Sequence, residues 1–143
     1  MIAVLDASVV LKWFFKDRPG ENDTEYALSV LCAIHADRIN LIQPPHFIPE
    51  VAALLARHTP ETATHDLSDL MQIDWQTGGE SNDYARAIDM AARLDHHLFD
   101  TLYHALALNT PGAVFITADR RYHDKASAHY DQSMLLEDLG SSL

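Results

Sequence analysis

The chain has 143 residues, of which 48% are hydrophobic and 22% charged, and its net charge at pH 7 is -11 with histidine neutral. This composition is typical of a soluble globular protein, so we expect a single domain over residues 1–143 with a sizeable core. We find no apolar run long enough to cross a bilayer and no basic leader, so we expect a cytoplasmic protein without a membrane partner. Cys32 is the only cysteine, which excludes an intramolecular disulfide and a cysteine metal cluster.

The negative charge argues against nucleic-acid binding through a basic surface, because proteins that contact phosphates usually carry a basic footprint. This argument fails where acids converge on divalent cations, since the ions reverse the local field. The basic residues are also grouped, although each alone can be an ordinary solvated helix position. Several of them flank two short segments: Lys12, Lys16, Arg18, Arg120, Arg121 and Lys125.

Predicted strands and helices alternate along the chain. The apolar run Ile2–Leu5 continues without a polar break to Asp6, which predicts a strand buried on both faces. Alternation of this kind predicts an α/β fold in which a parallel sheet lies between two layers of helices. The later elements that we expect are a helix over 8–16, a turn-rich break over 17–23, a helix from 23 or 24 to about 37, a strand over 40–43, a helix over 47–57, a helix from 59 to about 70, a weak strand around 71–75, a helix from 81 to about 94, a helix over 98–108, a strand over 113–117, a helix over 120–129 and a strand over 133–136.

Four acidic residues stand where predicted strands end or predicted helices begin. Asp6 and Asp119 follow strands, whereas Glu50 and Asp100 lie in the first turns of apolar helices. Each has an ordinary explanation, because Asp6 can cap the following helix and a helix dipole favours an acid in its first turn by about 0.3 to 1 kcal/mol. These explanations do not account for four acids at one edge of the sheet. In open parallel sheets, ligands bind at the carboxyl ends of the strands.

Converging carboxylates raise one another's pKa and destabilise the fold unless a cation binds between them. Oxygen ligands without cysteine or paired-histidine spacing favour a hard ion, Mg2+ or Mn2+. Such an ion activates water and stabilises the attacking and leaving oxygens of a phosphodiester. The residues themselves therefore predict metal-assisted phosphodiester hydrolysis.

Four segments carry a resemblance to a known family. They are VLDASVVLKWFF at 4–15, PPHFIPEVAALL at 44–55, FDTLYHALA at 99–107 and FITADRRY at 115–122. In this order they resemble PIN-domain ribonucleases, and most of all the VapC-type toxins of toxin-antitoxin pairs. The resemblance covers essentially the whole chain. It implies a three-layer α/β/α PIN-like domain with a mostly parallel sheet of about five strands.

The resemblance also implies a site and partners. It makes Asp6, Glu50, Asp100 and Asp119 the metal-binding acids for Mg2+ or Mn2+, although Asp124 could compete with Asp119. Family members cleave RNA, commonly form homodimers and are inhibited by a cognate antitoxin protein. The resemblance also gives supporting roles to two hydroxyl residues. Thr117 is the partner of Asp119, and Ser8 can orient a metal ligand or a metal-bound water.

Two other functions compete with a metal-dependent endoribonuclease. The first is a catalytically silent PIN-like module that binds RNA or protein, against which stands the presence of all four acids. The second is a phosphatase with Asp6 as covalent nucleophile. The segment Asp6 to Ser8 lacks the second aspartate that dehalogenase-like phosphatases carry, which argues against this function.

Several further residues receive structural interpretations. We expect Cys32 to be buried on an apolar helix face, His104 to be an ordinary polar position and His96-His97 to form a solvated turn. The aromatic cluster Trp13-Phe14-Phe15 is expected in the core or a dimer interface, with base stacking as the alternative. A dimer could use the apolar faces around 27–34 and 51–55. In the helix that begins near Ser81, the residues expected on the buried side are Tyr84, Ala87, Ile88, Ala91 and Leu94.

Overall fold

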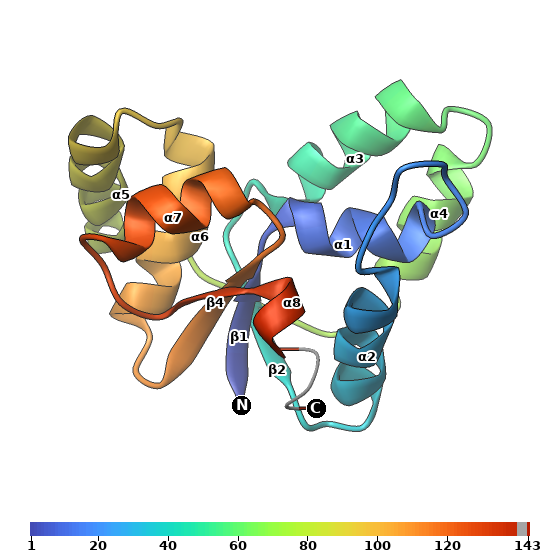
Figure 1. Cartoon of the computed structure of the whole chain (residues 1–143), viewed down its shortest axis with the longest axis horizontal. Coiled ribbons are helices and arrows are strands. Elements are labelled where there is room, and N and C mark those ends of the chain that lie inside the picture. Colours follow the sequence, from blue (N-terminus) through green and yellow to red (C-terminus); the bar gives the residue numbers. More distant parts are fainter. Residues whose placement is uncertain (140–142) are drawn as a thin grey trace.

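A five-stranded sheet forms the centre of the computed structural model, which describes residues 1–139 and 143 (Figure 1). The strands lie in the order β3-β2-β1-β4-β5, and all neighbouring pairs are parallel. The α/β fold expected from the sequence is thereby confirmed. The strands are β1 (Ile2–Leu5), β2 (Asn40–Gln43), β3 (Gln76–Thr77), β4 (Ala113–Thr117) and β5 (Ser133–Leu135).

Helices cover both faces of the sheet and complete three layers. Figure 1 shows α1 to α4 on one side of the strands and α5, α6 and α7 on the other, while α8 contacts β5 and α2. The described helices are α1 (Ala7–Phe14), α2 (Thr24–His35), α3 (Phe47–His58), α4 (Ala63–Leu70), α5 (Ser81–Leu94), α6 (Leu98–Asn109), α7 (Arg120–Ser127) and α8 (Leu136–Leu139). In this part of the chain, none of the helices combines the length and apolarity that a bilayer crossing requires.

The central strand β1 is paired along its length with β4 but only partly with β2. Backbone pairing with β4 runs from Ile2 to Leu5, whereas pairing with β2 covers Ile2 and Ala3. At Leu5 the fully buried Gln43 side chain replaces the missing backbone partner: its Oε1 accepts from the Leu5 N–H at 2.8 Å and its Nε2 donates to the Leu5 carbonyl at 2.9 Å. A side-chain amide thus satisfies both polar groups of a buried backbone unit.

The prediction for β3 was wrong. A strand was expected around 71–75, but the residues that pair with β2 are Gln76 and Thr77, and both are exposed. Their side chains carry no apolar pattern, so no sequence periodicity marks them. Their strand conformation comes from the position of β2, whose Ile42 and Gln43 lie alongside.

The buried side of α5 also differs from the expectation. Ala87 and Leu94 are buried as predicted, but Ile88 is 58% exposed and Tyr84 is 37% exposed. The buried set instead includes Met90 and Asp83, the latter because it closes a capping box with Glu80 at the helix start. The helix is therefore rotated relative to the expected face.

Three other side-chain expectations were also wrong. Cys32 is exposed on α2. The proposed dimer faces lie in the chain's own core, where Val30 and Val51, for example, are fully buried. His104 is also fully buried, with its Nδ1 accepting from the Tyr122 hydroxyl at 3.0 Å and its Nε2 donating to the Asp131 carbonyl at 2.7 Å. Burial lowers its pKa, which keeps this internal ring neutral.

The aromatic cluster after β1 packs as expected. Trp13 is buried, and its indole N–H donates to the Ala27 carbonyl at 2.8 Å. Phe15 is buried as well, and Phe14 packs against the core. These rings therefore pack α1 against α2 and the core, and their burial leaves them unavailable for base stacking.

Candidate acidic active site

Asp6 follows β1 directly, at the sheet position where the order of connections reverses. Strands β2 and β3 lie on one side of β1, and β4 and β5 lie on the other. Ligands of open α/β sheets bind outside the carboxyl ends of the strands at such a reversal point. Figure 1 shows β1 ending there between α3 on one side and α6 and α7 on the other.

The Asp6 carboxylate is held by two hydroxyl groups and does not cap a helix. Its Oδ2 accepts from Ser8 Oγ at 2.6 Å and from Thr117 Oγ1 at 2.9 Å. Asp6 does occupy the position before α1, but its side chain makes no capping hydrogen bond. Capping therefore does not explain this acid, whose side chain is directed to the end of β4.

The same two hydroxyls connect Asp6 to the segment that leads into α7. Ser8 Oγ accepts from the Ala118 N–H at 3.1 Å, and Thr117 Oγ1 accepts from the Asp119 N–H at 3.0 Å. A hydroxyl has one proton, and both hydroxyls donate theirs to Asp6. Ser8 and Thr117, both singled out from the sequence, are thus brought together with Asp6.

Asp119 directly precedes α7 as its N-cap residue and lies close enough to Asp6 to affect its pKa. Its Oδ1 accepts from the Tyr122 N–H at 3.1 Å, which is a helix cap, and its charge contributes to raising the pKa of Asp6. Asp124 lies on the exposed part of α7. Of the two acids, Asp119 therefore has the position that the site requires.

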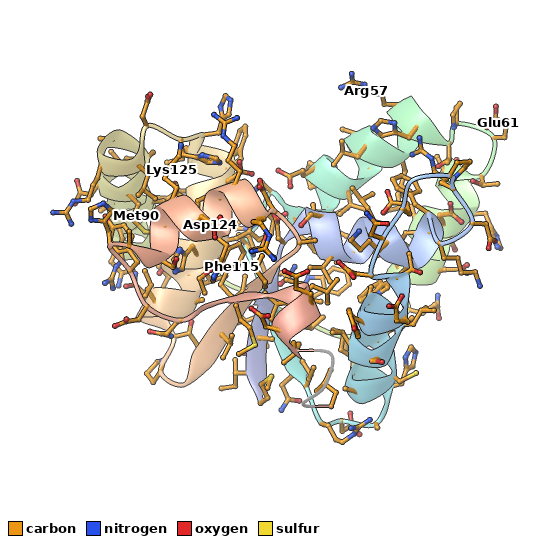
Figure 2. The ribbon with its side chains drawn as sticks, in the orientation of Figure 1. Arg57, Glu61, Met90, Phe115, Asp124 and Lys125 are labelled. Atoms are coloured by element: carbon orange, nitrogen blue, oxygen red, sulfur yellow. The ribbon has the colours of Figure 1, made fainter. Side chains whose placement is uncertain are left out.

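Asp100 lies in the first turn of α6 and contacts a histidine that the sequence did not single out as functional. His96 Nε2 is 2.8 Å from Asp100 Oδ2, and His96 Nδ1 is 3.2 Å from Lys125 Nζ. The Lys125 ammonium group can only donate a hydrogen bond, so His96 Nδ1 is the acceptor. The N–H of His96 is therefore at Nε2 and donates a hydrogen bond to Asp100. The His96 side chain is 12% exposed, which corrects the expectation of a solvated turn. Lys125 projects from α7, as Figure 2 shows.

Glu50, in the first turn of α3, is supported by Tyr103 and His46. The Tyr103 hydroxyl donates to Glu50 Oε1 at 3.3 Å, and His46 Nε2 is 3.9 Å from Glu50 Oε2. Burial lowers the pKa of His46, so this ring is neutral at pH 7. Burial raises the pKa of Tyr103, and nearby acids with Glu50 foremost raise it further.

The acids share one electrostatic environment. The pKa of Asp6 is raised from 3.8 to about 6, mainly by burial and further by the charges of Asp100 and Asp119. The pKa of Glu50 is raised from 4.5 to about 7, again mainly by burial and then by Asp6 and Asp100. These mutual charge effects couple carboxylates from four elements that are far apart in the sequence.

The chemistry of these donors fits a hard divalent cation. All four predicted ligands are carboxylates, the ligand type that hard divalent cations prefer. Burial and the neighbouring acids raise the pKa of Asp6 and of Glu50, and a positive charge between these carboxylates would offset that effect. Among the described residues, no three His, Cys, Asp or Glu side chains stand close enough together to hold an ion as placed. The side chains of the four acids, as placed, do not form a complete coordination site.

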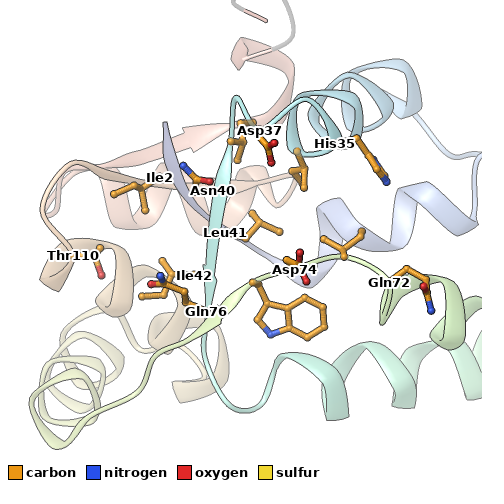
Figure 3. A pocket seen from close by; sticks show the side chains of 14 residues that line it. Ile2, His35, Asp37, Asn40, Leu41, Ile42, Gln72, Asp74, Gln76 and Thr110 are labelled. Carbon is orange, nitrogen blue, oxygen red and sulfur yellow. The ribbon is translucent and has the colours of Figure 1, made fainter.

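A cavity of about 580 Å³ lies elsewhere in the fold (Figure 3). It is lined by the amino-terminal ends of β1 and β2 and by the segment before β3, and it includes Asp37 and Asp74. None of the four predicted metal ligands lines it. The cavity therefore lies at the opposite end of the strands from the acidic site.

Sequence reasoning missed the residues that orient the acids. His96 lies in the short connection between α5 and α6, outside either helix, so helical periodicity gave no signal for its contact with Asp100. Tyr103, His46 and Lys125 had no signal either, because each reaches its acid or histidine from a different element.

Comparisons with known proteins bear on the fold only. No protein-family profile matches the chain, and no curated protein matches it. Among solved structures, the chain is similar to the crystal structure of PAE2754 from Pyrobaculum aerophilum, with a TM-score of 0.65 and 17% sequence identity over 99% of this chain and 93% of the other. At this identity the similarity extends to the three-layer α/β/α architecture and not to chemistry.

Proposed function

We propose that this chain is a Mg2+- or Mn2+-dependent endoribonuclease with a PIN-type domain, acting as the toxin of a toxin-antitoxin pair. The observation that carries the hydrolytic part of the proposal is the raised pKa of Asp6 and Glu50, which the neighbouring acids help to raise. Burying carboxylates together destabilises the metal-free fold, so their convergence is explained when a cation is their ligand.

Each residue at the site has a distinct role in this proposal. Asp6, Glu50, Asp100 and Asp119 would hold the metal, which when bound supplies an activated water and charge stabilisation at the phosphate. Ser8 and Thr117 fix the Asp6 carboxylate, and Tyr103 fixes Glu50. His96 and Lys125 orient Asp100. These supporting groups matter because the orientation of a ligand determines its affinity for the ion.

The partners of this activity are RNA and a cognate antitoxin, in the cytoplasm, and the active form is a homodimer. The acidic site motivates the first of these partners, because a metal bound there would interact with a phosphate. Light scattering at micromolar concentration tests the homodimer, and a mass close to 16.0 kDa would contradict it. Inhibition by a protein co-expressed with this chain tests the antitoxin.

The decisive experiment is cleavage of total RNA by the purified chain with Mg2+ or Mn2+, compared with EDTA. Asp100→Asn keeps the shape of the side chain and removes its charge, and Asp124→Asn makes the same change at an exposed acid of α7. We expect discrete, metal-dependent cuts that Asp100→Asn abolishes and Asp124→Asn retains. RNA that is bound equally by all proteins but never cut would instead identify a binding module.

A further inference from the structure

Phe99 is a large aromatic residue on the surface, directly before Asp100 in the first turn of α6. Its side chain is 60% exposed, the highest value among the exposed large hydrophobic residues of the described chain. Exposed apolar residues are common singly and need no explanation. Phe99 differs because of its place beside an acid of the candidate site and because of what holds it there.

His46 contacts Phe99 in two ways. The two rings stack with centroids 5.3 Å apart and planes at 27°, and His46 Nε2 donates to the Phe99 carbonyl at 2.8 Å. His46 also contacts Tyr103, whose ring centroid is 4.5 Å away and whose plane is tilted by 59°. Ring contacts therefore connect the exposed Phe99 through His46 to the buried Tyr103.

We propose that Phe99 stacks on an unpaired base of the RNA, adjacent to the phosphate that the acidic site acts on. This inference rests on the proposed function. Base stacking on an aromatic side chain is the usual way in which proteins hold single-stranded nucleic acid, and it tolerates any base because every base has a flat face. Among the described phenylalanine, tyrosine and tryptophan residues, only Tyr84 is also exposed, at 37%.

The surroundings of the ring favour a base over a protein partner. Polar residues adjoin Phe99: His46 stacks on its ring, and His97 and Asp100 lie within two positions of it in the sequence. The centre of a protein interface is instead a contiguous apolar area, depleted of charges. A single exposed ring next to polar groups can stack on one base while the acidic site interacts with the adjacent phosphate.

The test measures binding of a short fluorescent oligoadenylate with phosphorothioate linkages, which resist cleavage, in the presence of Mg2+. A second oligomer has the same backbone but lacks the bases. The variants are Phe99→Ala, Phe99→Tyr and Ile88→Ala, the last being a matched control because Ile88 is 58% exposed on α5. Unchanged thermal unfolding of each variant establishes that it is folded.

We expect Phe99→Ala to weaken binding of the oligoadenylate about 5- to 100-fold and to leave binding of the base-free oligomer unchanged. Phe99→Tyr and Ile88→Ala should bind both oligomers like the unaltered chain. Equal binding by Phe99→Ala, or an equal loss for both oligomers, would overturn the inference. A Phe99→Ala chain that binds RNA normally but no longer dimerises would assign the ring to a protein interface and overturn it as well.

Cleavage of total RNA is measured in parallel and separates this inference from the proposed function. Metal-dependent cleavage together with unchanged binding by Phe99→Ala would overturn the stacking inference alone. Phe99-dependent binding without any cleavage would overturn the nuclease proposal and leave the stacking inference standing.

Discussion

Thr117 donates a 2.9 Å hydrogen bond to the Asp6 carboxylate, although the two residues lie 111 positions apart in the sequence. The bond joins the ends of the adjacent strands β1 and β4. It gives a buried carboxylate one of its two hydroxyl donors at the point where the sheet order reverses. The stability of the fold and the charge of the candidate site are coupled through this contact.

Removing the charge of Asp6 should stabilise the metal-free chain in a pH-dependent way. Because its pKa is raised from 3.8 to about 6, the folded chain holds this proton more tightly than the unfolded chain does. Ionisation therefore disfavours folding progressively from about pH 4 to above pH 6, by at most about 3 kcal/mol. We expect Asp6→Asn to unfold at a higher temperature than the unaltered chain at about pH 8 in EDTA, and at a similar temperature near pH 4.

Asp124→Asn is the control for this pH dependence, because it removes one negative charge from an exposed position. It should leave the unfolding temperature nearly unchanged at both pH values. If Asp6→Asn were no more stable than Asp124→Asn at high pH, the Asp6 carboxylate would not be electrostatically strained.

Replacing Thr117 by valine should destabilise the chain and impair the site together. Valine has the shape of threonine without the hydroxyl, so the Asp6 carboxylate loses a donor and the Asp119 N–H loses an acceptor. A hydrogen bond to a buried charge contributes about 1.5 to 3 kcal/mol. Denaturant unfolding measures this loss, and we expect RNA cleavage to fall as well. Thr110→Val, which removes a hydroxyl bonded only to the Leu106 carbonyl, should leave cleavage intact.

Alanine substitution should distinguish Asp119 from Asp124. Asp119→Ala removes the cap of α7 at the Tyr122 N–H, with an expected loss of about 1 kcal/mol, and it should abolish metal-dependent cleavage. Asp124→Ala should change neither property, since its side chain is exposed along the helix. The reverse result would make Asp124 the fourth acid.

His96 should act on metal affinity through Asp100. Loss of a group that orients a metal ligand typically costs about 10- to 100-fold in affinity or activity. We expect His96→Ala to reduce cleavage by that order at low Mg2+ and to recover partly at high Mg2+, because the ligand itself remains. His65→Ala, at a histidine of α4 whose side chain is 79% exposed, is the control. A loss that no Mg2+ concentration relieves would point to a role other than ligand orientation.

Gln43 should be essential for the junction of β1 and β2. Gln43→Met keeps the length of the side chain but leaves the Leu5 N–H and carbonyl without the partners seen here. Each unsatisfied buried group costs about 1 to 3 kcal/mol, so we expect a loss of about 2 to 5 kcal/mol in urea unfolding. Gln72→Met, at an exposed position, should be nearly neutral, and a neutral Gln43→Met would mean that water replaces the amide.

The sequence by itself determined the α/β class, the bounds of three strands and the edge of the sheet at which the acids gather. Ile2–Leu5, Asn40–Gln43 and Ala113–Thr117 were predicted with the bounds that the structure has. The reason is local: a short apolar run between turn residues is a strand whatever surrounds it. Because parallel strands end on a common edge, Asp6 and Asp119 could be placed together without coordinates.

Only the tertiary structure decided which groups hold those acids and which polar residues are internal. Gln43, His104 and Tyr103 read as unremarkable positions in the sequence, yet each is fully buried because its partner comes from a distant element. The strand at Gln76 and Thr77 exists because β2 offers an unpaired edge. Periodicity reports one face of one element, whereas these contacts depend on how separate elements meet.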